Sequence, residues 1–143
     1  MDIAVIAIDG GSGVGKSSTA RALAERLSFL YIDTGSHYRA VTWMLQREKV
    51  PYTDEVAVTR ALTHWSLDAD IVGNVAEIRI AHTSFDSVLL RMPAVNAEVS
   101  YYAALPVVRK YLFHYQRSHK EIALLKGFKG LVMEGRDIGL NIF

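Results

Sequence analysis

The sequence predicts a single α/β domain built on a parallel sheet. Residues 3–8 form a continuous apolar run rich in β-branched side chains, typical of a strand buried on both faces. A glycine-rich turn follows, and then Ala20, Leu23, Ala24 and Leu27 recur at helical spacing. A buried strand, a tight loop and an amphipathic helix in this order begin a parallel α/β sheet. The length of 143 residues suits one domain.

Composition excludes several functional classes. The net charge of +1 disfavours a nucleic-acid surface, which usually carries a basic excess. Without cysteine there are no disulfides or thiolate sites, as expected of a cytoplasmic protein. Asp2 and Asp9 bracket the first apolar run, so a signal peptide is not expected, and no run reaches the roughly 20 residues of a membrane span. The histidines lack metal-ligand spacing, and we expect His114 and His119 on a helix surface. Oligomeric state is not indicated.

The next elements follow from apolar runs and punctuating residues. Residues 29–32 read as a second short strand ending at Asp33, and residues 35–49 as a helix before Pro51. Residues 93–105 and 106–126 read as two helices that each have proline in the first turn. We expect residues 130–134 to form another buried strand, after a helix cap at Gly127.

Residues 51–92 differ from the rest of the chain in their pattern of apolar and polar residues. Residues 54–66 favour a helix, and two alternating runs around Gly73-Asn74 favour a hairpin. Residues 84–90 are predicted as a further strand. We interpret 51–92 as a small inserted αβ subdomain within a core formed by about 1–50 and 93–143.

The stretch GGSGVGKSS has the form of a phosphate-binding loop. It matches G-x-x-x-x-G-K-[S/T], with a buried strand before it and a helix after it. Glycines let backbone N–H groups converge on phosphate oxygens, and the helix N-terminus and the lysine add positive charge. The predicted nucleotide-binding residues are Gly10, Gly11, Ser12, Gly13, Val14, Gly15, Lys16, Ser17 and Ser18. This context predicts a three-layer fold of the P-loop NTPase type.

Two further motifs follow predicted strands. In YIDTGSHYRA, Asp33 and Thr34 come at a strand end and Arg39 lies about one turn into the next helix. In EGRDIG, Arg136 and Asp137 follow the third strand. Strand ends on one side of a parallel sheet line the ligand crevice, so we expect these residues near the loop. A helix cap, a solvated arginine and an Arg–Asp pair in a turn are the simpler alternatives.

These motifs together resemble the bacterial-type cytidylate kinases. The resemblance rests on DGGSGVGKSSTARALAERLSFLYIDTGSHYRAV, VNAEVSYYAALPVVRKYLFHYQR and GLVMEGRDIG, in that order and spacing. It covers nearly the whole chain and is weakest in residues 52–92. It implies phosphorylation of CMP and dCMP by ATP with Mg²⁺, with the inserted segment binding the monophosphate.

The resemblance also implies roles for individual residues. Lys16, Arg39 and Arg136 would carry catalysis by neutralising phosphate charge, and the two arginines would hold the acceptor's phosphate. Ser100, Arg109 and Asp137 would read the cytosine edge, and Thr34 would line the same pocket. The hydroxyl that meets Mg²⁺ would be that of Ser17, although the neighbouring Ser18 is an alternative. ATP, CMP and dCMP would be the small-molecule partners.

The sequence departs from the family after EGRDIG. The family usually continues GTVVFPDA, whereas this chain reads GLNIF and stops at Phe143. The fold is therefore expected to be incomplete at its C-terminus, before the lid and the last core strands. This would leave a central strand as an exposed edge. A catalytically weak nucleotide-binding remnant and another P-loop small-molecule kinase, such as one acting on shikimate, remain alternatives to an active enzyme.

Overall fold

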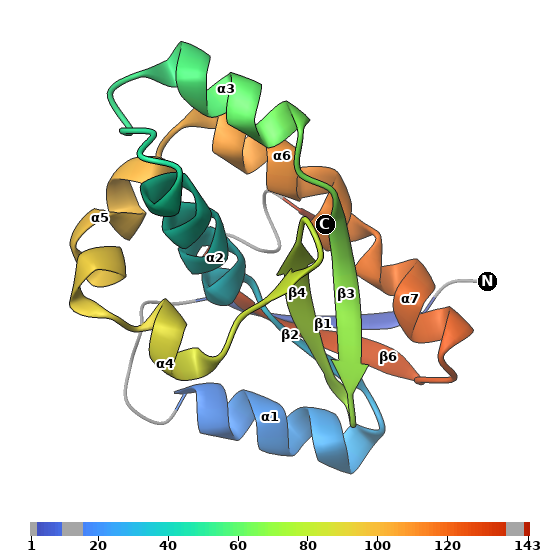
Figure 1. The fold of residues 1–143 in the computed structure, drawn as a ribbon. Coiled ribbons are helices and arrows are strands. Elements are labelled where there is room, and N and C mark those ends of the chain that lie inside the picture. The colour runs from blue at the N-terminus through green and yellow to red at the C-terminus, as the bar shows by residue number, and fades with distance from the viewer. Residues whose placement is uncertain (1–2, 10–15, 137–141) are drawn as a thin grey trace. The chain divides into compact units, whose positions relative to one another are not determined.

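The computed structural model describes residues 3–9, 16–136 and 142–143. The described strands and helices follow one another in this order: β1 (Ala4–Asp9), α1 (Lys16–Leu27), β2 (Leu30–Asp33), α2 (Thr34–Arg47), α3 (Glu55–Thr63), β3 (Leu67–Val72), β4 (Val75–Ile80), β5 (Thr83–Ser84), α4 (Ser87–Leu90), α5 (Pro93–Ala103), α6 (Pro106–Arg117), α7 (His119–Leu125) and β6 (Gly130–Gly135). The predicted α/β class with a mostly parallel sheet is confirmed (Figure 1).

The chain divides into two compact units that interleave along the sequence. Unit 1 comprises Met1–Gly35, Asp70–Glu77 and Tyr115–Phe143. Unit 2 comprises Ser36–Ala69 and Ile78–His114. The core and inserted subdomain expected from the sequence have other boundaries and stay a prediction.

Three parallel strands form the centre of unit 1. β6 pairs with β1 on one side and with β2 on the other, both in parallel, and β2 pairs in parallel with the start of β4. The sheet order is β1-β6-β2-β4-β3, with β5 pairing antiparallel to β4. Strands adjacent in space are therefore far apart in the chain, which is the usual consequence of helical crossovers in parallel sheets.

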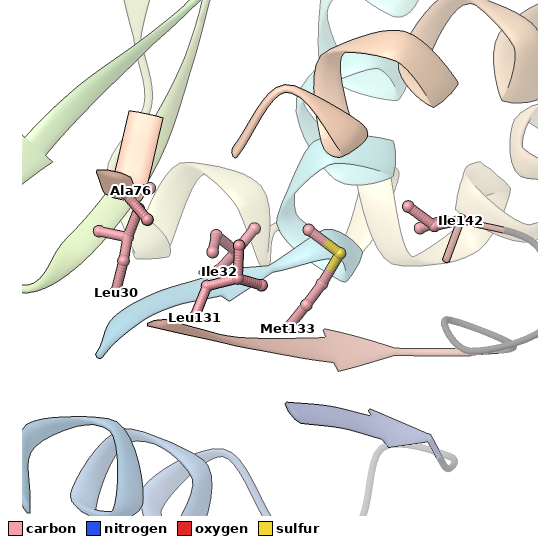
Figure 2. Packing of buried hydrophobic residues seen from close by; sticks show 7 residues of the cluster. Leu30, Ile32, Ala76, Leu131, Met133 and Ile142 are labelled. Carbon is pink, nitrogen blue, oxygen red and sulfur yellow. The ribbon is translucent and has the colours of Figure 1, made fainter. Parts of the chain in front are cut away.

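The alternation of side chains along β6 and β2 explains why both faces of this sheet are covered. Leu131 and Met133 pack in one apolar cluster with Leu30, Ile32 and, from α7, Ala123 (Figure 2). The intervening residues point the other way, toward α1: Val132 and Tyr31 pack with Ala20 and Ala24. Helices thus lie on opposite faces of the unit 1 sheet, which gives the three layers that the sequence predicts.

The burial predicted for the first strand is wrong. β1 lies at one end of the sheet order, and none of its residues is fully buried. Among the described strands β6 is its one neighbour, so its other side carries no sheet partner.

Unit 2 consists mainly of helices. Asp54 caps α3 by accepting a hydrogen bond from Ala57 N, and the Tyr111 hydroxyl of α6 donates to the Trp65 carbonyl just after α3 at 2.8 Å. Gln46 of α2 donates to Ala94 O and Glu98 Oε1 of α5 at 2.9 and 2.7 Å. These polar contacts bind α3 to α6 and α2 to α5.

The predicted hairpin is confirmed, but the strand expected over residues 84–90 is wrong. β3 and β4 flank a turn at Gly73, whose φ of 62° lies in the left-handed region that favours glycine. After the two-residue β5, the chain forms the one-turn helix α4. Asp86 accounts for the difference because its carboxylate accepts from Leu89 N at 2.7 Å and caps that helix.

The helix expected over residues 106–126 is divided at Ser118. The Tyr115 carbonyl accepts from Ser118 Oγ at 2.6 Å and from His119 Nδ1 at 2.9 Å, so side chains compete for a main-chain acceptor there. His119 was expected on the helix surface, yet it is fully buried and its ring meets that of Tyr115 edge-on. Gly127, with a φ of 82°, ends α7 as predicted.

Candidate active site

The carboxyl ends of three parallel strands meet at one edge of the unit 1 sheet. In the strand register, Asp9 pairs with Gly135 and Asp33 pairs with Glu134. The glycine-rich stretch starts directly after β1, and α1 begins at Lys16. Ligands of open parallel sheets bind outside this edge, so it is the candidate site in unit 1.

Glu134 is anchored at this edge by hydrogen bonds to two residues of distant sequence position. Its Oε2 accepts a hydrogen bond of 2.5 Å from the Tyr31 hydroxyl, and its main-chain carbonyl accepts from Thr34 Oγ1 at 2.9 Å. Thr34 is itself buried, with 3% of its surface exposed. Both contacts fix the end of β6 against β2, immediately before Arg136.

Tyr31 is held in its neutral form. Burial is the main reason that its pKa is raised, and the hydrogen bond to Glu134 and the nearby charge of Asp33 act in the same direction. The Arg21 guanidinium lies 5.6 Å from the ring centroid and opposes the shift. A tyrosine that stays protonated remains a hydrogen-bond donor to the Glu134 carboxylate.

The predicted nucleotide-binding loop is described only in part. Gly10 to Gly15 lie outside the described residues, as does Asp137. Lys16 and Ser17 start α1, but only their backbone is described, and Ser18 is exposed on the same helix. The predicted binding of phosphate and Mg²⁺ by this loop stays a prediction.

Arg39 is the best-defined of the predicted acceptor residues, and it lies in unit 2. Its Nη1 donates to the Leu90 carbonyl at the end of α4, at 3.2 Å, and to Asn96 Oδ1 of α5. Asn96 Nδ2 donates in turn to the Arg91 carbonyl at 3.1 Å. Two consecutive elements of unit 2, α4 and α5, therefore hold this guanidinium, which α2 supplies.

The other predicted acceptor residues in unit 2 are Arg109 on α6 and Ser100 on α5. Arg109 of α6 hydrogen-bonds the hydroxyl of Tyr38, the residue before Arg39, and although burial raises the pKa of Tyr38, the Arg109 charge opposes that shift. Ser100 is exposed on α5, four residues after Asn96 and thus on the same helix face. Unit 2 therefore gathers Arg39, Ser100 and Arg109 about α2 and α5. Arg136 is exposed at the end of β6 in unit 1.

Sequence reasoning missed Tyr31, Tyr38, Asn96 and Glu134 as parts of this arrangement. Each lies within four residues of a predicted site residue. This closeness along the chain is the signal by which the sequence could have indicated them. The partner that each one contacts comes from a distant part of the chain, and no spacing in the sequence reveals it. Glu134 had the plainest signal, a carboxylate at a strand end directly before Gly-Arg-Asp.

The described residues also bear on the requirements of a metal site and of a membrane span. Among the described residues no cluster of three histidine, aspartate or glutamate side chains could hold a metal ion. In the same part of the chain, no helix combines the length and the apolar character that crossing a bilayer requires.

Comparison with known proteins assigns the family. The sequence model of the cytidylate kinases matches residues 6–143. The chain belongs to the cytidylate kinase family. Its family name denotes a kinase, which is a phosphotransferase, and the P-loop NTPase-like fold agrees with the mostly parallel sheet described above.

Curated relatives agree with this assignment. A cytidylate kinase of Pelotomaculum thermopropionicum is 43% identical over 136 residues, which cover 94% of this chain and 57% of that protein. A bifunctional pantoate ligase/cytidylate kinase of Synechococcus elongatus is 38% identical over 143 residues, 97% of this chain and 26% of that protein. A protein of the same name from Prochlorococcus marinus is 43% identical over 141 residues. The chain thus spans between a quarter and three fifths of the length of these relatives.

Proposed function

We propose that this chain binds ATP at residues 10–18 and transfers the terminal phosphoryl group to the phosphate of CMP or dCMP. The observation that carries the proposal is the register of β1, β6 and β2. It brings Asp9, which directly precedes the predicted phosphate-binding stretch in the sequence, to the same edge of one sheet as Glu134 and Gly135, which directly precede Arg136. Membership of the cytidylate kinase family supports cytidine as the acceptor's nucleoside.

The proposed phosphoryl transfer does not need a side chain that acts as a general base. The attacking group is an oxygen of the acceptor's phosphate and is already an anion, so no general base is required. The protein's part is to align the two phosphates and to neutralise their charge. Lys16 would serve the donor phosphates, while Arg39 and Arg136 would hold the acceptor's phosphate.

Mg²⁺ would accompany the phosphates of the donor nucleotide, because oxygen is the ligand type that it prefers. Since Mg²⁺ is usually held by substrate phosphates and one or two side chains, Ser17 would supply the direct protein ligand. The bound ion would add charge neutralisation of the transferred phosphoryl group.

Base recognition would fall to Ser100, Arg109 and Asp137. A hydroxyl, a guanidinium and a carboxylate offer donors and acceptors to the amino and carbonyl groups of cytosine. A base that leaves such groups unpaired is rejected strongly. As an enzyme of nucleotide metabolism, the protein is expected to act in the cytoplasm.

The test is a phosphoryl-transfer assay on the purified chain with ATP, Mg²⁺ and each nucleoside monophosphate in turn. We expect turnover with CMP or dCMP, much slower turnover with AMP and UMP, and loss of turnover in Lys16→Ala with little change in its melting temperature. Full activity in Lys16→Ala would show that the loop is wrongly assigned. Equal rates with AMP and CMP would remove the base-reading role, and binding of ATP without any turnover would indicate a nucleotide-binding remnant.

A further inference from the structure

The amide of Asn96 is placed to fix the orientation of the Arg39 guanidinium. A guanidinium carries five N–H donors, of which Nη1 provides two. The Leu90 carbonyl and Asn96 Oδ1 are acceptors for these two, so Nη1 is satisfied within unit 2. α4 supplies the first of these acceptors and α5 supplies the second.

The remaining donors of Arg39 form the edge that matches a phosphate. No described residue hydrogen-bonds Nε or Nη2, and these two nitrogens lie side by side on one edge of the planar group. Arginine binds phosphates best through two parallel N–H···O bonds from such an edge. With Nη1 held, rotation about the long side chain is restricted and this edge is presented in one direction.

The orientation of Asn96 is fixed as well. Its Nδ2 donates to the Arg91 carbonyl at 3.1 Å, so its Oδ1 is the end that turns toward Arg39. Asn96 lies in the first turn and a half of α5, and its own amide N–H bonds the Met92 carbonyl. A short side chain on a helix, with both ends of its amide used, is a rigid support for a flexible arginine.

We infer that Asn96 is a positioning residue for the acceptor's phosphate: it holds Arg39 by Nη1 and leaves the Nε–Nη2 edge to bind the monophosphate. This inference rests on the proposed function, in which Arg39 receives that phosphate. Asn96 itself does not touch the nucleotide. Its effect therefore depends on the phosphate and on the presence of Arg39.

A purely structural role makes a different prediction. Asn96 also joins α2 to α5, and so does Gln46, which bonds Ala94 O and Glu98 Oε1 without contacting Arg39. If the tie between the two helices were all that matters, Gln46→Ala and Asn96→Ala would have the same effect on nucleotide binding. Gln46→Ala is therefore the matched control.

Titration calorimetry of the full chain with CMP and with cytidine tests the inference. Asn96→Ala removes one charge-assisted hydrogen bond at a partly exposed site, so the dissociation constant for CMP should rise about tenfold. The affinity for cytidine, which lacks the phosphate, should not change. Gln46→Ala should leave both affinities at the wild-type value, and thermal melts should show that all variants are folded.

A double mutant separates action through Arg39 from any other route. In the Arg39→Ala background, Asn96→Ala should cause no further loss of CMP affinity, because its target is gone. The inference fails if Asn96→Ala leaves CMP affinity unchanged, if cytidine binding weakens by the same factor as CMP binding, or if the two losses multiply. If Arg39→Ala itself has no effect on CMP, or the wild-type chain binds no CMP, the proposed function fails and the inference with it.

Discussion

Removal of the Tyr31 hydroxyl tests the anchoring of Glu134 at the sheet edge. In Tyr31→Phe the ring stays in its pocket, where 2% of the residue's surface is exposed, so the change creates no sizeable cavity. What is lost is the 2.5 Å hydrogen bond to Glu134 Oε2. The carboxylate then has one donor fewer, and it is only partly accessible to water.

The expected loss follows from that geometry. Hydrogen bonds to charged groups contribute about 1.5–3 kcal/mol. Since water can reach the half-buried Glu134, we expect the lower end of this range, ~1.5 kcal/mol, in the free energy of unfolding. For a chain of this length such a loss lowers the melting temperature by about 3–6 °C.

Urea unfolding followed by tryptophan fluorescence measures the change. Tyr111→Phe is the matched control, because its hydroxyl donates to the neutral Trp65 carbonyl at 2.8 Å, and its removal should cost less, ~1 kcal/mol. In a double-mutant cycle with Glu134→Ala, the coupling energy should be about 1.5 kcal/mol. A coupling energy within ~0.3 kcal/mol of zero would refute the reasoning, because Tyr31 would then stabilise the fold without acting on Glu134.

Two further predictions concern packing and protonation. A Cβ at Gly130 would lie 2.6 Å from the Ala4 carbonyl oxygen and 2.7 Å from Phe29 Cζ. Gly130→Ala should therefore destabilise the fold by about 1–3 kcal/mol in the same urea assay. An unchanged unfolding midpoint would contradict the tight pairing of β1 with β6. Burial lowers the pKa of His119 below its ordinary 6.5. In acid the unfolded chain therefore binds a proton at His119 more readily than the folded chain does. The free energy of unfolding should fall as pH drops below 6.5. His119→Asn should make that fall shallower between about pH 6.5 and 5, and an equal slope in both proteins would show that His119 is not its source.

The local structure of this chain could largely be predicted from its sequence, because its signals are local. Prolines start α5 and α6, Gly73 and Gly127 sit where the backbone needs a positive φ, and α1 follows from the spacing of its apolar residues. The strand expected over residues 84–90 failed because one hydrogen bond from Asp86 decides the local structure there. An apolar run such as VLL fits a strand and a buried helical turn equally well.

Burial and partners could not be predicted in the same way. The apolar run of β1 would suit a strand with neighbours on both sides, but the run itself does not encode which strands flank it. His119 looked like a surface residue because its burial depends on unit 1 as a whole. The residues expected to hold phosphates came from motifs. The contacts of Tyr31 with Glu134 and of Asn96 with Arg39 join segments 103 and 57 positions apart, and no local pattern predicts them.

The pairing of β1 with β6 also constrains how this protein is made. Ala4 pairs with Gly130, so the two strands are separated by roughly 126 positions along the chain. At about 5–20 residues per second, a ribosome takes on the order of 6–25 s between synthesising the first strand and its partner. During that interval the apolar β1 segment has no β6 to pair with, so the nascent chain is open to aggregation until β6 is made. Synonymous codon changes between the coding regions of β1 and β6 that slow translation should therefore lower the yield of folded protein without changing its final stability.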